Sequence, residues 1–424
     1  MIIIIYETFF TTLTIQKMMK YVCCQIGARE HYAIPRALNN MNQLNCLITD
    51  SWVSNRSILN KLPENVLRNL RERFHPDLSQ AQVFSFTESI IAFELQQKWL
   101  KTKGWEKIIA RNDWFQRKTV DLLKKQSFVV DKESPICVFA YSYAALEIFR
   151  YAKSQGWKTI LGQIDPGIAH EKRVLQEYSK YSEYESSTKK SPSCYWDKWY
   201  QECASADQII VNSKWSSVAL QEAGIDQNKV KIVPLAYEKS NKSILSQRQY
   251  PPSFSDHRPL KVLFLGNVVL NKGILYLLQA VKLLTNLPIE VTIVGSLGIN
   301  KPSLQEYPNV KWIGAVSRSM TAHYYQEADV FIFPTLSDGF GLTQLEAQSW
   351  QLPVITSLLC GDVVQDRVNG LILSEVTGET IAQALKFCLE NPPELQKFSD
   401  NAQNHLENFS ILNLQQELSK ITLK

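Results

Sequence analysis

The 424-residue chain lacks the short motifs that would assign a chemistry at once. It has neither a G-x-x-x-x-G-K-[ST] loop nor a G-x-G-x-x-G pattern, so the usual signatures of a P-loop and of a dinucleotide-binding fold are missing. Its eight cysteines show no C-x-x-C spacing, which argues against a zinc site and a disulfide framework and favours a reducing cytoplasm. No apolar run approaches the ~18 residues of a membrane-spanning helix.

Length and composition indicate a soluble globular protein of more than one domain. Hydrophobic residues make up 45% of the chain and charged residues 21%, and at roughly 150 residues per domain the length fits two or three cores. Residues 1–17 contain an apolar run, but no basic residue precedes it, so a secretory signal is not expected. We treat this segment as an upstream extension and expect the folded chain to start at Met18 or Met19.

Positive charge is concentrated in the first half of the chain. Residues 1–235 hold 31 Lys/Arg and 24 Asp/Glu, a net +7, and residues 236–424 hold 15 and 17, a net −2. The densest run, residues 98–125, has nine cations against three acids. The aromatic residues within it are Trp99, Trp105, Trp114 and Phe115. Such a run is either a helix on an anionic membrane surface or a solvated helix whose aromatics pack inward. Without a nucleic-acid-binding motif, the modest excess argues against a nucleic-acid partner.

Strand-like and helix-like patterns alternate along both halves. In the first half, strands are predicted at residues 21–26, 46–49, 136–141, 159–164, 208–212 and 230–233. In the second half, they are predicted at residues 260–265, 290–294, 310–313, 329–334, 353–356 and 371–373. Short apolar strands separated by helix-length stretches imply parallel sheets covered by helices on both faces, an α/β fold class.

A polar segment without periodicity, residues 238–259, separates the two halves and reads as a linker. We therefore predict two Rossmann-like domains, residues 18–237 and 260–398, and a helical end, residues 399–424, that packs back on the first domain. In open parallel sheets, ligands bind beyond the carboxyl ends of the strands. Two facing sheets would place a cleft between the domains.

Two strand-to-helix turns of the second domain carry residue types that attract an anion. One, residues 266–273 (GNVVLNKG), places Lys272 at the start of a helix, and the other is a D-G-F-G turn at residues 338–341 that leads into a helix near Leu342. Glycines let the backbone approach a ligand closely, and free amides at helix starts attract phosphate. Glu346, one turn further on, could accept hydrogen bonds from sugar hydroxyls. Taken alone, the D-G-F-G turn is also consistent with an ordinary strand-to-helix turn, and residues 266–273 fit a helix-capping loop with an exposed Lys better than a binding loop.

Together the two turns resemble those of retaining glycosyltransferases of the GT-B fold, glycosyltransferase family 4. That family has a Lys-Gly pair after the first strand of its second domain and, further along, an E-x7-E pattern in the context P-x-x-x-E-G-F-G-L-x-x-x-E-A. Here that pattern runs from Pro334 through Asp338 to Glu346 and Ala347. Segments of the first domain also look like family landmarks: residues 163–167, 206–213 and 231–235.

The resemblance implies a metal-independent transfer, with retention, of a sugar from a nucleoside diphosphate to a hydroxyl acceptor. A UDP-sugar is the first expectation for the donor and GDP-mannose the second, while the acceptor is a glycan, a lipid or a small molecule. No cofactor beyond this co-substrate is implied, and the sequence contains no D-x-D triplet of the kind that bridges a metal in the other major glycosyltransferase fold. The implied location is cytoplasmic, either free or peripheral at the inner membrane face through residues 98–125. Two alternatives stay open: a nucleotide-sugar binding protein without turnover, and a sugar-nucleotide epimerase.

The resemblance also assigns donor contacts. Lys272 would bind the diphosphate, Glu346 the ribose, and the residues after the strand at 310–313 the base. The donor-binding positions implied are Gly266, Asn267, Lys272, Gly273, Gly314, Ala315, Gly339, Phe340, Gly341, Leu342 and Glu346. Asn267 stands where the family often has Arg, which should weaken diphosphate binding by roughly 1.5 to 3 kcal/mol if nothing replaces that charged hydrogen bond.

The catalytic positions implied by the resemblance are Asp338, Asp165 and His31. Asp338, where the family usually has Glu, would face the donor sugar near the anomeric carbon. Asp165 follows a predicted strand at a position where relatives carry a sugar-contacting or catalytic residue. His31 lies in the loop after the opening strand, which could equally be an ordinary surface loop. The acceptor-binding candidates are Gly27, Arg29 and His170.

Overall fold

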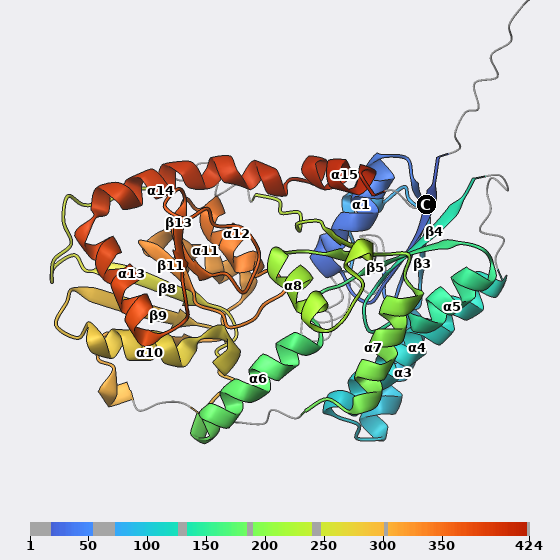
Figure 1. Cartoon of the computed structure of the whole chain (residues 1–424), viewed down its shortest axis with the longest axis horizontal. Coiled ribbons are helices and arrows are strands. Elements are labelled where there is room, and N and C mark those ends of the chain that lie inside the picture. Colours follow the sequence, from blue (N-terminus) through green and yellow to red (C-terminus); the bar gives the residue numbers. More distant parts are fainter. Residues whose placement is uncertain are drawn as a thin grey trace, which may run out of the picture.

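The computed structural model describes residues 18–53, 73–125, 134–184, 190–239, 247–300 and 304–421. Two parallel α/β domains lie side by side, and the carboxyl-terminal helices run along both of them (Figure 1). The predicted architecture of two Rossmann-like domains is therefore confirmed. The upstream extension, residues 1–17, and part of the predicted linker, residues 240–246, lie outside the described residues.

The amino-terminal domain contains a seven-stranded parallel sheet in the order β3-β2-β1-β4-β5-β6-β7. Its strands are β1 (Lys20–Gln25), β2 (Leu44–Thr49), β3 (Val83–Ser85), β4 (Ile136–Tyr141), β5 (Lys158–Gly162), β6 (Gln208–Val211) and β7 (Val230–Ile232). Six of these strands were predicted from apolar runs. The edge strand β3 was not, because its three residues, two partly buried and one exposed, are too few to show a period.

Helices cover both faces of this sheet. They are α1 (Ala33–Asn40), α3 (Thr87–Trp99), α4 (Gly104–Lys125), α5 (Leu146–Ser154), α6 (Ile168–Lys180), α7 (Ser193–Ser205) and α8 (Lys214–Glu222). Along β1, Val22 and Cys24 pack into one hydrophobic cluster, and Tyr21 and Cys23 pack into the cluster on the opposite face. Side chains alternate across a strand, so burial of both faces explains why the strand reads as a continuous apolar run.

The carboxyl-terminal domain contains a six-stranded parallel sheet in the order β10-β9-β8-β11-β12-β13. Its strands are β8 (Leu260–Leu265), β9 (Ile289–Val294), β10 (Val310–Gly314), β11 (Val330–Phe333), β12 (Val354–Ser357) and β13 (Gly370–Leu373). Its helices include α10 (Ile274–Leu283), α11 (Arg318–Glu327), α12 (Leu342–Ser349) and α13 (Gly378–Glu390). All six predicted strands occur, with ends displaced by at most one residue, because each is a short apolar run bounded by turn residues.

Both sheets reverse their strand order at the centre, between β1 and β4 in one domain and between β8 and β11 in the other. Loops leaving neighbouring strands at such a point run in opposite directions and leave a crevice beyond the carboxyl ends of the strands. The loop at 27–32 follows β1, and the turns at 266–273 and 334–341 follow β8 and β11. The fold therefore brings the predicted site loops to the switch points of the two sheets.

The end of the chain connects the two domains. Helix α14 (Pro392–His405) lies on the carboxyl-terminal domain, and α15 (Ile411–Ser419) reaches α1 of the other domain (Figure 1). Leu414 and Leu418 are buried there in one cluster with Leu38. Within the described ranges, no helix combines the length and apolar content needed to cross a membrane.

Candidate active site

A pocket of about 400 Å³ opens between the two domains. Its walls come from the loops that follow β1, β8 and β11, which lie at the switch points of both sheets. The predicted site residues that line it are Arg29, Gly266, Asn267, Lys272, Asp338, Phe340, Gly341 and Leu342. Its volume falls in the range of small-molecule sites, roughly 300 to 1,000 Å³.

Gly273 fixes the position of Lys272. Its backbone has φ 73°, and a Cβ atom at this position would lie 1.9 Å from the carbonyl oxygen of Pro334, so a side chain cannot be accommodated. The neighbouring Asn271 carbonyl accepts hydrogen bonds from the Leu336 amide at 2.8 Å and the Thr335 hydroxyl at 3.0 Å. The turn after β8 is therefore tied directly to the turn after β11.

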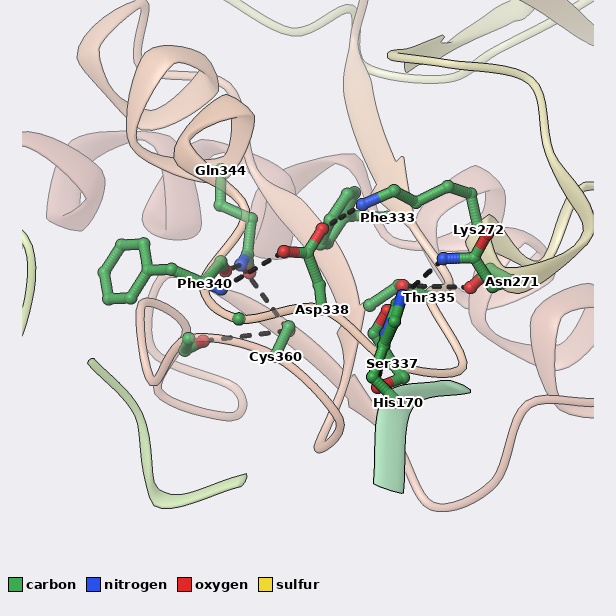
Figure 2. Close-up of polar contacts among 12 residues, drawn as sticks. His170, Asn271, Lys272, Phe333, Thr335, Ser337, Asp338, Phe340, Gln344 and Cys360 are labelled. Atoms are coloured by element: carbon green, nitrogen blue, oxygen red, sulfur yellow. Dashed lines mark hydrogen bonds and ion pairs between the residues drawn. The ribbon is translucent and has the colours of Figure 1, made fainter. Parts of the chain in front are cut away.

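The Lys272 ammonium points into the pocket and forms an ion pair with Asp338 (Figure 2). The two side chains are 21% and 20% exposed, and the ammonium also lies 5.0 Å from the centre of the Phe333 ring. The other carboxylate oxygen of Asp338 accepts a hydrogen bond from the Phe340 amide at 3.2 Å. Charges that are mostly buried need a partner, so Asp338 balances the charge of Lys272.

Helix α12 begins at the same pocket. Gly341, which precedes it, has φ 82°, and a Cβ atom there would lie 2.5 Å from the Phe333 ring. Leu342 and Thr343, the first residues of α12, line the pocket. The first amides of a helix have no partner within the helix and carry its positive dipole end. One wall of the pocket thus presents an ammonium group and a helix amino terminus together.

Glu346 lies in a second, neighbouring pocket of about 220 Å³ rather than beside Lys272. The two pockets share the lining residues Glu30 and Leu342. The Glu346 carboxylate accepts a hydrogen bond from the Tyr325 hydroxyl at 2.8 Å. Burial raises the pKa of Glu346, and the Tyr325 hydrogen bond and the charge of Arg318 oppose this shift. The sequence predicted both Glu346 and Lys272 as donor contacts; in the structure they line two pockets that share Leu342, the first residue of α12.

The loop after β1 has an unusual backbone. Glu30, His31 and Tyr32 are consecutive non-glycine residues with φ values of 52°, 49° and 60°. A left-handed conformation costs an L-residue roughly 1–2 kcal/mol, and such strain collects at functional sites. The loop turns Glu30 toward both pockets and places His31 in the second pocket, where its Nε2 lies 3.1 Å from the guanidinium of Arg318.

Glu30 and Arg318 are pocket residues that the sequence interpretation missed. Burial raises the pKa of Glu30 to about 7, and the adjacent Arg29 charge partly opposes this. Asn212, also missed, lines the first pocket at the end of β6. The only sequence signal for Glu30 as a site residue was its position between the candidates Arg29 and His31. Arg318 had no such signal, because it reaches the pocket only when α11 packs against the other domain.

Asp165 and His170 lie beside the D-G-F-G turn but do not line the two pockets. The Oδ1 atom of Asp165 accepts hydrogen bonds from the Tyr143 hydroxyl at 2.5 Å and the Gly167 amide at 2.8 Å, which fixes the turn before α6. The Nδ1 atom of His170 lies 3.0 Å from the Ser337 hydroxyl (Figure 2). Burial lowers the pKa of His170. His170 therefore positions the turn that carries Asp338, while Asp165 positions the turn before α6.

The remaining predicted positions support the loops or lie outside the pockets. Gly27 donates its amide to the Asp50 carboxylate at 2.8 Å, which anchors the loop after β1. The Gly339 carbonyl accepts a hydrogen bond from the Ser213 hydroxyl of the other domain at 2.9 Å. Gly314 and Ala315 are exposed after β10 and are not among the residues that line the two pockets.

Among the described residues, one group of three side chains has the spacing of metal ligands: His75, Asp77 and Glu238. The Arg36 guanidinium already pairs with both carboxylates, at 2.7 Å from Asp77 and in direct contact with Glu238. Because this cation bridges both acids, the cluster is explained as an ion-pair network at the edge of the second pocket.

Comparisons with known proteins agree with this arrangement. Residues 259–391 match the family model of glycosyl transferases group 1. An uncharacterized 41.2 kDa protein in the cps region of Klebsiella pneumoniae is 28% identical over 171 residues, which cover 40% of this chain and 48% of that protein. CapM of Staphylococcus aureus, a capsular polysaccharide biosynthesis glycosyltransferase, is 29% identical over 156 residues, 34% of this chain and 40% of that protein. The matches thus span about half or less of the length of these relatives.

Solved structures resemble the chain over nearly its whole length. HepE of Anabaena in complex with UDP gives a TM-score of 0.57 at 13% identity, covering 95% of this chain and 99% of that one. Sucrose-phosphate synthase of Thermosynechococcus elongatus gives 0.60 at 15% identity, covering 95% and 98%. At such identities the likeness shows a shared two-domain fold.

Proposed function

We propose that this chain, a member of the group 1 glycosyltransferases with the GT-B fold, transfers a sugar from a nucleoside diphosphate to a hydroxyl acceptor in its interdomain pocket. The observation that carries the proposal is the wall on which the Lys272 ammonium and the amino terminus of α12 meet. The family match covers the carboxyl-terminal domain, which holds both features.

This wall suits the departure of a diphosphate. When the bond between the sugar and the phosphate breaks, negative charge grows on the phosphate oxygen. Lys272 and the amides of Leu342 and Thr343 would stabilise that charge, and fixed donors in a water-poor site are worth more than the same groups in water. We propose that these groups replace the metal ion that bridges the phosphates in other sugar-nucleotide enzymes.

Asp338 would have two roles in sequence. Without donor, its ion pair holds the Lys272 ammonium inside the pocket. With donor bound, the diphosphate would take over Lys272, and the carboxylate would stabilise the positive charge that develops on the sugar. The shorter side chain of Asp, compared with the Glu that is usual in the resembling family, already reaches Lys272.

We propose transfer with retention of configuration. The acids among the residues that line the first pocket are Glu30 and Asp338. Asp338 accepts a hydrogen bond from the Phe340 amide, and we assign it the charge-stabilising role above rather than that of a nucleophile. In the proposed step, the carbon–oxygen bond to the diphosphate breaks and the acceptor oxygen bonds to the same carbon from the same side. The hydroxyl proton passes to the departing phosphate oxygen, so charge and protons balance without a protein nucleophile.

A UDP-sugar is the donor that we propose. The structural neighbour HepE was solved with UDP and with UDP-glucose. We place the nucleoside in the second pocket, where Glu346 would accept hydrogen bonds from the ribose hydroxyls. Because two curated relatives are named for capsular polysaccharide synthesis and a cps region, we propose a saccharide or a lipid-linked saccharide as acceptor.

The test is a donor screen with the purified full chain. UDP, GDP and ADP sugars are compared by thermal shift, and nucleotide release is then measured with and without saccharide acceptors. We expect stabilisation by UDP-sugars and release that rises with acceptor. Binding without release would identify a nucleotide-sugar binding protein, and conversion of the donor without acceptor would identify an epimerase; either result contradicts the proposed transfer.

A further inference from the structure

Helix α3 has apolar side chains on two opposite faces. Ile90 and Phe93 are buried in the core of the amino-terminal domain. On the other face, Ile91, Leu95 and Trp99 follow each other at four-residue spacing and are 41%, 64% and 80% exposed. A surface helix of a globular protein normally has one apolar stripe, directed at the core. The second stripe of α3 is not needed for folding and therefore points to a function at the surface.

Cations border this stripe. Leu100, 49% exposed, continues it into the turn between α3 and α4. Lys98, Lys101 and Lys103 are exposed around the same turn, and no ion pair is recorded for them among the described residues. Lys107 of α4 pairs with Glu94 of α3 at 2.7 Å, which ties the two helices together. The apolar stripe and its lysines are thus presented as one rigid corner, called here the α3–α4 corner (residues 91–103).

The corner differs from the surface that the sequence suggested, residues 98–125. That stretch is not one helix, because α3 ends at Trp99 and α4 begins at Gly104. Trp114 and Phe115 are buried in the core, and Trp105 lies against Tyr195 with the ring centroids 4.8 Å apart. Most aromatic side chains of residues 98–125 therefore pack inward. The exposed apolar side chains of this region are concentrated at residues 91–100.

We propose that the α3–α4 corner docks on an anionic lipid bilayer, with Leu95, Trp99 and Leu100 in the interface and the lysines against the headgroup phosphates. Apolar side chains beside cations are the composition of membrane-surface helices, and Trp prefers the bilayer interface. Helices α3 and α4, which form the corner, lie beside α7 in the amino-terminal domain (Figure 1). Residues 91–103 are not among those that line the interdomain pocket, and the proposal does not depend on the proposed transfer.

A second copy of this chain is a less suitable occupant. In a two-fold dimer the same patch meets itself, so the lysines of one corner would face those of the other without a compensating charge. Anionic headgroups provide that charge. Charge complementarity therefore favours lipid over self-association.

The test is vesicle flotation with the full chain, using neutral phosphatidylcholine vesicles and vesicles that also contain phosphatidylglycerol. We expect binding to the anionic vesicles only, and at least a tenfold weaker apparent affinity when salt rises from about 0.05 M to about 0.5 M. Absence of binding, or equal binding to neutral vesicles, would overturn the proposal.

Matched variants locate the surface. Leu95→Ser with Trp99→Ser should weaken vesicle binding at least tenfold, and Lys98→Gln, Lys101→Gln and Lys103→Gln should each weaken it about fivefold. The charge control removes three exposed cations of α4 outside the corner: Arg117→Gln, Lys118→Gln and Lys124→Gln. The apolar control is Leu283→Ser, at a 60% exposed residue of the other domain. Equal losses in the controls would contradict the corner as the docking surface.

Two further measurements separate the other occupants. If the wild type is a dimer in solution and the Leu95→Ser, Trp99→Ser variant is a monomer, the apolar stripe is a dimer interface. This result would overturn lipid docking. A chain that starts at Met18 should keep vesicle binding; if it loses binding while the corner variants retain it, residues 1–17 carry the interaction instead. UDP binding, measured by thermal shift, should be unchanged in all these variants. The test of lipid docking is therefore independent of the test of sugar transfer.

Discussion

The loops that meet at the interdomain pocket are built in opposite ways. In the two pocket turns of the carboxyl-terminal domain, after β8 and β11, the positions with a positive φ, such as Gly273 and Gly341, are glycines, so these turns are unstrained and closely packed. In the amino-terminal domain, three residues with side chains, Glu30 to Tyr32, adopt the same backbone region. The comparison indicates a rigid wall for the diphosphate opposite a strained loop that neighbouring contacts hold in place.

The largest expected effect comes from breaking the rigid side. Gly273→Ala puts a Cβ atom into the Pro334 carbonyl and should lower the free energy of unfolding by about 3 kcal/mol, with loss of UDP binding. Urea denaturation measures this. Gly104→Ala is the matched control, because that glycine has φ 56° but open space around it, and it should cost about 1 kcal/mol. If the two variants lose the same free energy of unfolding, the turn after β8 is not closely packed.

The second prediction separates binding from turnover at the same wall. Asp338→Asn removes the carboxylate that competes with a diphosphate for Lys272, so UDP should bind at least as tightly as in the wild type. Turnover should fall about 100-fold, or about 2.7 kcal/mol, because the sugar loses a stabilising charge. Calorimetry with UDP and initial rates measure the two quantities. If UDP affinity and turnover fall together, Asp338 serves only to hold Lys272 in place.

The third prediction concerns the second pocket. Glu346→Gln should raise the KM for the donor about tenfold, or about 1.4 kcal/mol, with little change in kcat, because the lost contact to the ribose is made equally in the ground and transition states. Tyr325→Phe is the control for repacking, since it removes only the hydroxyl bonded to Glu346. An effect confined to the acceptor would contradict the placement of the nucleoside.

The smallest expected effect is a change in how the stability of the chain depends on pH, and it tests the strained loop that carries Glu30. The pKa of Glu30 is raised from 4.5 to about 7, so between these values the folded chain holds a proton that the unfolded chain has released. Stability should therefore fall as pH rises through this window and level off above it. In Glu30→Gln this pH-dependent contribution should disappear. Thermal unfolding of both proteins at several pH values measures the difference, and identical profiles would mean that folding does not raise the pKa of Glu30.

The strands and the two glycine turns could be predicted from the sequence because they depend on local patterns. A buried parallel strand is a short apolar run, and Lys272 and Asp338 sit at fixed distances from such runs. Their meeting in one pocket follows from the strand order, since β8 and β11 are neighbours.

The rest depends on packing that no local pattern records. Glu346 lies in its own compartment because α12 turns its side chain toward Tyr325. The Asp165 carboxylate accepts a hydrogen bond from Tyr143, which is 22 residues away in sequence. The exposed stripe of α3 was missed because apolar residues on both faces obscure the helical period, so inward and outward residues could not be separated.

The most direct measurement is calorimetric titration of UDP into the wild type, Lys272→Ala and Lys282→Ala. Lys282 is the control, an exposed lysine on α10 paired with Glu306 outside the pocket. The account predicts at least tenfold weaker binding for Lys272→Ala and wild-type binding for Lys282→Ala. Wild-type affinity in Lys272→Ala would contradict the claim that this ammonium and the start of α12 form the diphosphate site.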